Sequence, residues 1–164
     1  MLRTGLVALS VTLACCAHGE TILPLANSGF EEALAGWSVT AFPGVTCEVT
    51  EHAATGQLAL HVVDNSNQKG SSVLSGAVSI EGTGAFELRG MYFPVSGSGL
   101  GMYVREYNAA GEVINSERSH LVGLGGEERR WLRFARRLYT STEARSLRIW
   151  VHSYDAAIVE AYLD

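Results

Sequence analysis

The stretch Asn27-Ser28-Gly29-Phe30-Glu31, followed at a short distance by Gly36-Trp37, decides the fold of this chain. Its two aromatic side chains are large apolar groups that can close one end of a β-sandwich, and its first glycine allows a backbone angle that other residues avoid. Because side chains alternate along a strand, Glu31 is expected to point away from the core that holds Phe30. The stretch predicts the opening strand of a sandwich, with Glu31 either a solvated acid or an ion ligand.

The segment before this stretch has the features of an export signal. Met1-Leu2-Arg3-Thr4 is short and positively charged, and residues 5–17 are apolar but too few to span a bilayer. Ala17-His18-Gly19 places small residues at the two positions that a signal peptidase inspects. Residues 1–19 are therefore predicted to be a signal peptide cleaved after Gly19, so that the mature chain is secreted, periplasmic or displayed at the cell surface.

The cysteines bear on both export and chemistry. Cys15 or Cys16 could carry a lipid, but Thr12 stands where a lipobox expects Leu, so lipidation is the less favoured alternative. Cleavage leaves Cys47 alone, and an exported chain with one cysteine has no internal disulfide. Nothing around Cys47 resembles a cysteine-enzyme signature, which predicts a buried, unreactive thiol.

The length and charge of the chain limit its partners. Its 164 residues suffice for one domain with a hydrophobic core, predicted over residues 20–164. The formal net charge of −5 argues against nucleic acid as the main partner. No apolar segment after the signal is long enough for a transmembrane helix.

Short apolar runs that alternate with polar residues dominate the mature chain, and turn signals recur about every 8–12 residues. This pattern predicts an all-β sandwich or barrel. Pro94 is expected to end the strand that begins at Phe86, residues 95–99 to form a turn, and residues 161–164 to begin a last strand. The other expected strands lie at 37–40, 46–49, 58–62, 73–80, 101–107, 112–114, 129–140 and 146–152.

The order of these segments resembles that of the family 4/9 carbohydrate-binding modules. The resemblance implies a galactose-binding-like jelly-roll β-sandwich of two antiparallel sheets that binds sugar without catalysis. The family continues beyond its terminal Asp with another acid and a final strand, whereas this sequence stops there, so either the sequence is a fragment or its last strand is incomplete. The matching residues are Asn27-x-Gly29-Phe30-Glu31 with Gly36-Trp37, Gly56-x-Leu58-Ala59-Leu60, the 78–84 run into Phe86-Glu87-Leu88, Tyr107-Asn108-x-x-Gly111, Trp131-x-x-Phe134 and Leu163-Asp164.

The resemblance also implies a structural calcium ion. In such modules the opening Glu and the closing Asp often bind the ion together with main-chain carbonyls, and calcium prefers several oxygen ligands. By resemblance, Glu31 and Asp164 are the side-chain ligands, and carbonyls near Asn27 or Gly29 and from the His52 loop would complete the shell. The ion would pin the N- and C-terminal strands together and take no part in catalysis.

Alternation divides each expected strand into two faces and suggests a ligand surface. If the strands are neighbours in one sheet, its outer face carries aromatic rings, which stack on sugars, among arginines and histidines, which bond sugar hydroxyls. That chemistry suits a poly- or oligosaccharide. The competing interpretation makes Tyr103 and Tyr107 core residues and has Trp150 close one end of the sandwich. The candidate ligand-binding residues are His61, Arg89, Tyr103, Arg105, Tyr107, Arg148, Trp150 and His152.

One basic run and two acids are also candidates for function. Residues 129–137 fit either a polyanion site or a solvated strand, and the solvated strand is favoured because acids precede the run and its apolar residues suit core contacts. Glu87 and Glu106 could formally form the carboxylate pair of a glycosidase, but surface or edge acids are the favoured interpretation. The sequence contains no Gly-x-Ser-x-Gly, His-Glu-x-x-His or Cys-x-x-Cys motif.

Three functions follow from these observations. The first is a secreted, non-catalytic carbohydrate-binding module, which fits an accessory domain of a glycan-degrading enzyme. The second is a cell-surface structural or protein-interaction sandwich without a sugar ligand, and the third and least favoured is a hydrolase acting on glycosyl bonds. Binding on a glycan array separates the first two, and release of reducing ends from a glycan panel tests the third.

Overall fold

Two stacked β-sheets form the structure. The computed structural model describes residues 10–13, 21–115 and 120–164, and over these ranges it contains thirteen strands and no α-helix. Every strand pairing is antiparallel, which confirms the predicted all-β fold with two antiparallel sheets. None of the described segments is a helix that could cross a membrane.

Seven strands form the first sheet, sheet A: β1 (Ser10–Leu13), β2 (Thr21–Leu23), β4 (Val45–Thr50), β5 (Ala59–Asp64), β8 (Ala85–Gly97), β11 (Leu132–Tyr139) and β13 (Val159–Leu163). Their order is β2-β1-β8-β13-β5-β4, and β11 also pairs with β8. Because β8 is long, it pairs with β11 along its first part and with β13 along its second part.

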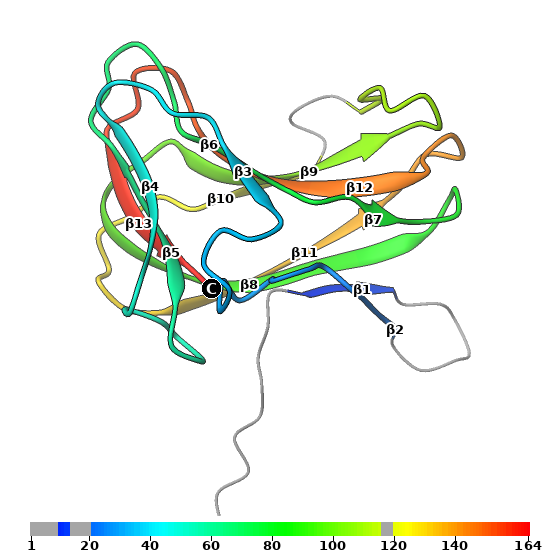
Figure 1. Ribbon diagram of the computed structural model, residues 1–164, viewed down its shortest axis with the longest axis horizontal. Helices are drawn as coiled ribbons and strands as arrows, with labels where there is room; N and C mark the ends of the chain where they lie inside the picture. The colour runs from blue at the N-terminus through cyan, green and yellow to red at the C-terminus, as the bar shows by residue number, and fades with distance from the viewer. Residues whose placement is uncertain (1–9, 14–20, 116–119) are drawn as a thin grey trace, which may run out of the picture.

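Six strands form sheet B: β3 (Trp37–Val39), β6 (Ser72–Ser75), β7 (Val78–Ser79), β9 (Leu100–Tyr107), β10 (Leu121–Gly123) and β12 (Ser146–Ser153). Their order is β10-β9-β12-β6-β3, with β7 also beside β12. The strand expected over 73–80 is therefore two strands, parted at Gly76, whose N–H donates to the carbonyl of Gly36 at 2.7 Å. Figure 1 shows the two layers, with β9 and β12 above β8 and β11 in this view.

The core lies between the sheets and is built from the inward residues of both. Alternation is clear on β12, where Leu147, Ile149 and Val151 are buried in the core cluster. Phe86 and Leu88 of β8 face inward as predicted. Burial of each such side chain contributes on the order of 2 kcal/mol to stability.

The stretch that opens the fold is a turn and not the predicted strand. Residues 26–29 and 31–36 have turn geometry, and β3 begins only at Trp37. The positive φ angles of this turn fall on Asn27, Phe30, Ala33 and Gly36, with φ of 48°, 58°, 53° and 79°, and not on Gly29. Asn27 explains the difference, because its amide Nδ2 donates to two main-chain carbonyls of the turn at 2.8 and 2.9 Å and asparagine tolerates this conformation.

The two aromatic anchors of this stretch are confirmed. Phe30 is 1% exposed and Trp37 is 7% exposed, and their ring centroids lie 4.9 Å apart. The indole Nε1 of Trp37 donates to the carbonyl of Asn27 at 3.0 Å. The pair therefore ties the turn to the core.

β8 continues through Pro94, where the sequence predicted its end. Pro94 is buried and lies opposite Ala161 of β13, next to a bulge between Glu160 and Ala161. A bulge is one of the few places in a sheet that tolerates proline, which has no N–H to donate. Residues 95–97 consequently belong to the strand, and the expected turn is confined to 98–99.

Both ends of the described chain join sheet A. β1 falls within the segment predicted to be cleaved, and it pairs with residues 86–89 of β8. β13 begins at Val159, ahead of the expected start at Ala161, and pairs with β5 on one side and β8 on the other. Asp164 continues the ladder through two main-chain hydrogen bonds with Met91, at 3.0 and 2.7 Å.

Candidate functional site

The outer face of sheet B brings together six of the predicted ligand residues. β9 and β12 are neighbours, and their register places Tyr103 opposite Trp150 and Arg105 opposite Arg148. The residues between them along each strand, such as Val104 and Ile149, belong to the core cluster, so the six point outward. This surface, the β9–β12 face, consists of Tyr103, Arg105, Tyr107, Arg148, Trp150 and His152.

Trp150 is held between two flat side chains. The guanidinium carbon of Arg105 lies 3.5 Å from the centroid of the Trp150 ring, and the ring of His152 stacks at 4.0 Å with the planes 10° apart. Two groups this close to the centre of one ring cannot share a side of it, so they lie on opposite sides of the indole. Trp150 is 8% exposed and Tyr103 beside it 2% exposed, so these rings support the face from beneath, and stacking of a sugar on Trp150 would require one of its sides to be uncovered.

Any direct contact between this face and a ligand would therefore be made by its polar side chains. Nδ1 of His152 lies 2.5 Å from the carbonyl of Ser71, and because a carbonyl can only accept, Nδ1 carries the proton and donates. Nε2 is then the ring nitrogen left for a ligand, as an acceptor when the ring is neutral. The guanidinium of Arg148 lies 5.3 Å from the ring centroid of Tyr107, and both residues are half-buried.

Gly101 makes room for the ring of Tyr103. A Cβ at Gly101 would stand 2.5 Å from Cδ1 of Leu121, closer than real contacts allow, and 3.0 Å from the Tyr103 ring, which is tighter than most real contacts. Gly101 lies opposite His152 in the register. The glycine thus lets the aromatic ring occupy the space between β10 and β12.

Arg89 and His61 do not belong to the β9–β12 face. Both lie on the outer face of sheet A, so the expectation that all eight candidates share one sheet is wrong. Nε of Arg89 bonds the carboxylate of Glu87, which Arg137 also reaches at 3.2 Å. The hydrogen bond from Arg89 is the main cause that lowers the pKa of Glu87. Alternation shows which side of a strand a residue takes but not which sheet the strand joins, and this explains the error.

A row of rings that the sequence did not suggest crosses the outer face of sheet A. The register places His61, Tyr162 and Phe93 side by side on three neighbouring strands, and the rings of His61 and Tyr162 stack at 4.2 Å. The strand order was the missing signal, because these residues are far apart in sequence. The aromatic row consists of His52, His61, Phe93, Trp131 and Tyr162.

Acids border one end of the aromatic row. Nε2 of His61 lies 3.1 Å from a carboxylate oxygen of Glu160, and its Nδ1 lies 3.7 Å from Glu48. Burial first, and then these two negative charges, raise the pKa of Tyr162. His61 therefore already has ionisable partners within the protein.

The two predicted calcium ligands meet at one loop, residues 52–58. Glu31 accepts two main-chain N–H groups from this loop, at 2.9 and 3.1 Å, and Asp164 accepts two others, at 2.9 and 2.6 Å. Burial raises the pKa of Asp164, the loop donors lower it, and the charge of Glu31 adds to the rise. Two like-charged carboxylates with hard oxygen atoms fit calcium, although the described residues form no group of three or more His, Cys, Asp or Glu around a metal.

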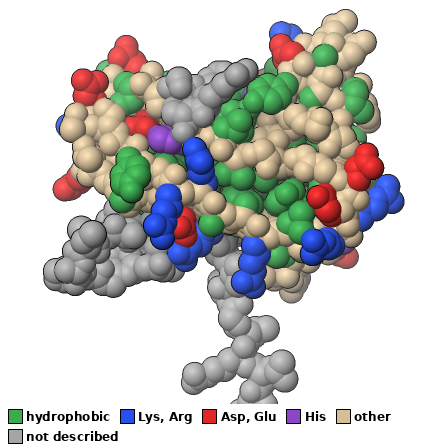
Figure 2. Space-filling view, turned by 180° about the vertical axis from the view of Figure 1, so that it is seen from behind, with side chains coloured by type: hydrophobic (Ala, Val, Ile, Leu, Met, Phe, Trp, Pro, Cys, Tyr) green, Lys and Arg blue, Asp and Glu red, His purple; other side chains and the backbone are tan. Residues whose placement is uncertain are grey.

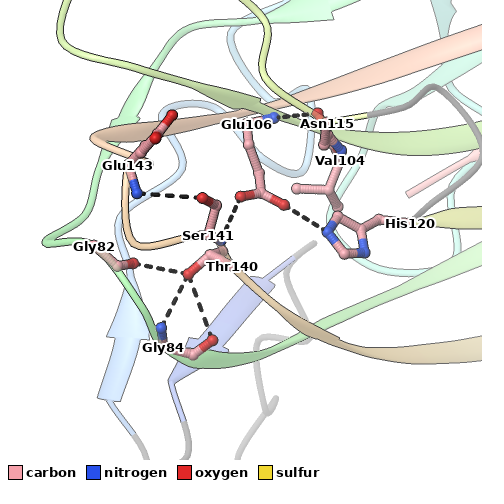
Figure 3. A network of polar contacts seen from close by, with 9 residues as sticks. All are labelled: Gly82, Gly84, Val104, Glu106, Asn115, His120, Thr140, Ser141 and Glu143. Atoms are coloured by element: carbon pink, nitrogen blue, oxygen red, sulfur yellow. Dashed lines mark hydrogen bonds and ion pairs between the residues drawn. The ribbon is translucent and has the colours of Figure 1, made fainter.

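Glu106 lies in a buried polar network that Figure 3 shows from close by. It is 3% exposed, and its carboxylate accepts from the main-chain N–H of Ser141 and from Nε2 of His120, both at 2.7 Å. The N–H of Glu106 donates to Oδ1 of Asn115 at 2.8 Å. The expectation of a surface or edge acid is wrong for Glu106, because this carboxylate joins β9, the start of β10 and the turn before β12.

The described acids do not form the glycosidase pair that the sequence allowed formally. Glu87 faces outward from sheet A, whereas Glu106 is buried beneath sheet B. Cys47 is half-buried against the core, and burial first, then the charge of Asp64, raise the pKa of its thiol to about 11. A thiol that is neutral at physiological pH is a poor nucleophile, which agrees with the predicted unreactive cysteine.

The basic run forms β11 and the loop before it. Phe134 and Leu138 pack on the core as expected of a sandwich strand, while the arginines of the run are exposed. Figure 2 shows Lys and Arg side chains spread over one side of the molecule and interspersed with acids, and not gathered in one patch. The arrangement supports the solvated strand that the sequence favoured.

Comparison with known proteins identifies the fold. No protein-family model matches this sequence, and no curated protein matches it. The xylan-binding domain CBM22-1 of Xyn10C from Paenibacillus barcinonensis is similar in structure, with a TM-score of 0.58 at 19% identity over 83% of this chain and 86% of that chain. The module TmCBM61 in complex with β-1,4-galactotriose gives a TM-score of 0.53 at 17% identity, over 87% and 94% of the two chains.

A phage protein shares the fold as well. The enzymatically active domain of tailspike protein 4 from bacteriophage CBA120 gives a TM-score of 0.68 at 10% identity. The match covers 86% of this chain and 20% of that chain, so this chain spans about a fifth of the tailspike domain. At these identities the likeness shows a shared β-sandwich fold, and it does not identify families 4 and 9 in particular.

Proposed function

We propose that this chain is a non-catalytic carbohydrate-binding module that holds a poly- or oligosaccharide on the β9–β12 face. The observation that carries the proposal is the β9–β12 register, which places on one surface six residues whose side chains suit contact with sugars. Two structures with the same fold support the class of ligand, because one is a xylan-binding domain and the other holds β-1,4-galactotriose.

The polar groups of this face suit sugar hydroxyls. Arg105 and Arg148 can donate through several N–H groups, and Nε2 of His152 can accept from a hydroxyl. These side chains stand on a hydrogen-bonded sheet, and rings fix their positions, so little conformational entropy is lost when a ligand binds. Binding therefore needs no conformational change of these side chains.

The positions of the acids support the absence of catalysis. Glycoside hydrolysis uses two carboxyl groups that flank the bond, roughly 5–10 Å apart. Glu87 and Glu106 belong to different sheets, and Glu106 is engaged with His120 and Ser141 inside the sandwich. Any hydrolase activity would then reside in a linked domain.

Calcium is part of the proposal as a structural ion. Glu31 and Asp164 would hold it beside the loop at 52–58, and its positive charge would offset their mutual repulsion. The ion would strengthen the link between the opening turn and β13.

Export, a linked enzyme and family membership complete the proposal. The composition of residues 1–19 supports a signal peptide cleaved after Gly19 and a mature chain outside the cytoplasm. An accessory domain of a glycan-degrading enzyme fits such a module, and the ordered motifs from Asn27 to Asp164 support membership of the family 4/9 group.

A protein-interaction module without a sugar ligand is the second candidate. The aromatic row favours it, since half-buried and exposed rings on an outer sheet face are common where proteins meet. The two candidates predict different surfaces, because the aromatic row lies on sheet A and the β9–β12 face on sheet B.

Retention in gels that contain a polysaccharide tests the proposal. Wild-type protein is run through gels with xylan, galactan, mannan or cellulose derivatives, beside the Tyr107→Ala and Trp131→Ala variants, and circular dichroism confirms that each variant folds. We expect wild type and Trp131→Ala to be retarded by the same glycan and Tyr107→Ala to lose about tenfold in affinity, as for one lost polar contact. Retardation lost only in Trp131→Ala, or absent for every glycan, would contradict the proposal.

A further inference from the structure

Three buried polar residues, named here the Asp64 chain, link sheet A to the β9–β12 face. Asp64 ends β5 in sheet A, Ser153 ends β12 in sheet B, and Ser71 comes directly before β6. All three are 0% exposed. Burial of polar groups costs free energy unless each of them is hydrogen-bonded, so three such residues in one place point to a specific role.

The hydrogen bonds of the Asp64 chain run in one direction. A carboxylate can only accept, so the hydroxyl of Ser153 donates its single hydrogen to Oδ2 of Asp64, at 2.5 Å. The same hydroxyl oxygen then accepts from the main-chain N–H of Ser71 at 2.6 Å and from the Ser71 hydroxyl at 2.8 Å. Oδ1 of Asp64 accepts from the N–H of Ser66 at 2.9 Å. Ser71 is therefore held against β12 by its side chain and by its main chain.

The Asp64 chain ends at His152. The carbonyl of Ser71 accepts from Nδ1 of His152 at 2.5 Å. Gly70 permits this approach, because a Cβ there would stand 1.7 Å from the carbonyl oxygen of Ser153 and 3.1 Å from Cε1 of His152. The buried residues thus fix the position of the carbonyl that His152 bonds.

Stacking on Trp150 fixes the plane of the His152 ring but not its orientation within that plane. The two rings lie 4.0 Å apart and 10° from parallel, and an imidazole turned by 180° about its bond to Cβ keeps the same plane. Each of these two orientations allows two neutral tautomers. The hydrogen bond to Ser71 selects one of the four states, in which Nδ1 carries the hydrogen and Nε2 is left as an acceptor.

We propose that Asp64, Ser153 and Ser71 are positioning residues of the sugar site, which hold His152 with Nε2 as a fixed hydrogen-bond acceptor. The inference rests on the proposed function and adds to it the residues that prepare the site from inside the sandwich. With Nε2 so fixed, the ligand must offer a hydroxyl hydrogen at this point. A sugar whose hydroxyl there carries a methyl group has no hydrogen to donate and binds more weakly.

Two serine variants separate positioning from stability. Ser153→Ala removes the hydroxyl that joins the three residues. Ser75→Ala is the matched control, because Ser75 is 2% exposed and its hydroxyl also links β6 to β12, accepting from a main-chain N–H and donating to a main-chain carbonyl, both at 2.8 Å. Circular dichroism checks that each variant folds. Should Ser153→Ala not fold, Asp64→Asn takes its place, since an amide has one acceptor oxygen where the carboxylate has two.

The first measurement needs no ligand. Nitrogen-15 NMR of the imidazole at about pH 8.5, above the ordinary pKa of histidine, shows which ring nitrogen carries the hydrogen. We expect His152 to be the Nδ1–H tautomer alone in wild type and in Ser75→Ala, and a mixture of tautomers in Ser153→Ala. A purely structural role of Ser153 would not change the tautomer.

The second measurement is affinity, by calorimetric titration with xylohexaose, β-1,4-galactotriose, mannohexaose and cellohexaose. We expect Ser153→Ala to bind about fourfold more weakly than wild type, because one of four ring states is competent and apparent affinity scales with that fraction. Ser75→Ala should bind as wild type does. In a His152→Ala background, adding Ser153→Ala should cause no further loss, as a double-mutant cycle shows when one residue acts through another.

The outcomes distinguish the inference from the function on which it rests. A mixture of tautomers in wild type, the same tautomers in Ser153→Ala as in Ser75→Ala, or an equal loss from Ser153→Ala with and without His152 would overturn the positioning role and leave the proposed function standing. Failure of wild type to bind any of the four oligosaccharides or the polysaccharides of the gel panel would overturn the proposed function itself, and with it the role of the Asp64 chain in binding.

Discussion

Glu106 shows how much one residue can organise in this protein. Its carboxylate and main-chain N–H together bond His120, Ser141 and Asn115, which come from three separate segments. The sequence indicated correctly that Glu106 points away from Tyr103 and Tyr107, because alternation decides that. It could not show the burial or the partners, since these depend on how Asn115, His120 and the turn at 140–145 lie against β9.

Removing this carboxylate should destabilise the fold strongly. Glu106→Ala leaves the N–H of Ser141 and the ring of His120 without their acceptor, and loss of one partner of a buried pair costs about 3–5 kcal/mol. Urea denaturation measures the change in the free energy of unfolding. Glu112→Ala is the matched control, because Glu112 is exposed, and it should stay within about 0.5 kcal/mol of wild type. Equal effects of the two substitutions would contradict the structural role of Glu106.

Cys47 gives a second prediction at the level of a residue. Because the pKa of its thiol is raised from 9.0 to about 11, the reactive thiolate is about a hundredfold scarcer at neutral pH than in the unfolded chain. A thiol reagent should therefore label the Cys47 peptide slowly in native protein and rapidly in urea, as followed by mass spectrometry. Rapid labelling of the native protein would show an accessible or activated thiol and contradict this prediction.

At the level of elements, the loop at 52–58 joins the opening turn to the C-terminal strand. Glu31 from the turn and Asp164 after β13 both accept hydrogen bonds from its main chain. The sequence suggested that these two acids come together through a family resemblance, and the structure does place them at one loop. The sequence also predicted the place of most strands. It did not predict the turn that Asn27 stabilises or the bulge that lets β8 continue past Pro94, because both depend on side-chain hydrogen bonds and on pairing partners far along the chain.

Calcium should raise the melting temperature, and EDTA should lower it again. Without a cation, ionisation of Asp164 opposes folding, because burial raises its folded pKa above the ordinary 3.8. The stability that this group contributes is complete below that ordinary value and declines as pH rises through the raised value. Scanning calorimetry near neutral pH, with and without calcium, measures the effect. In Glu31→Gln and Asp164→Asn, calcium should no longer raise the melting temperature. An unchanged melting curve after careful chelation of the wild-type protein would refute the proposed calcium site.

Considered as a whole, the molecule is a sandwich with two chemically different outer faces. The assignment of each strand to a sheet decides which residues meet, and this assignment is what alternation alone could not supply. In the structure this assignment places Arg89 and His61 on sheet A, apart from the other six candidates, and it brings the residues of the aromatic row together. The six that stayed together were predictable because they come from two strands, β9 and β12, that are direct neighbours.

The mature domain should fold without the predicted signal peptide. The described core cluster lies between Leu23 and Leu163, and β1 adds only a short pairing with β8. A chain of residues 20–164 is therefore expected to unfold in one cooperative transition by calorimetry and circular dichroism. Protein recovered after export should begin at Glu20, as N-terminal sequencing would show. Loss of cooperative unfolding in the shortened chain would mean that β1 is an integral strand.

The central claim, that sugar binds to the β9–β12 face, is tested most directly by mapping a glycan onto the protein by NMR. The mature domain is labelled with nitrogen-15, and amide shifts are followed while a glycan that retards it in gels is added as an oligosaccharide. We predict saturable shifts confined to β9, β12 and the adjoining β6, centred on Arg105, Arg148 and His152. Shifts confined to the aromatic row of sheet A, or no saturable shift with any oligosaccharide, would contradict the claim.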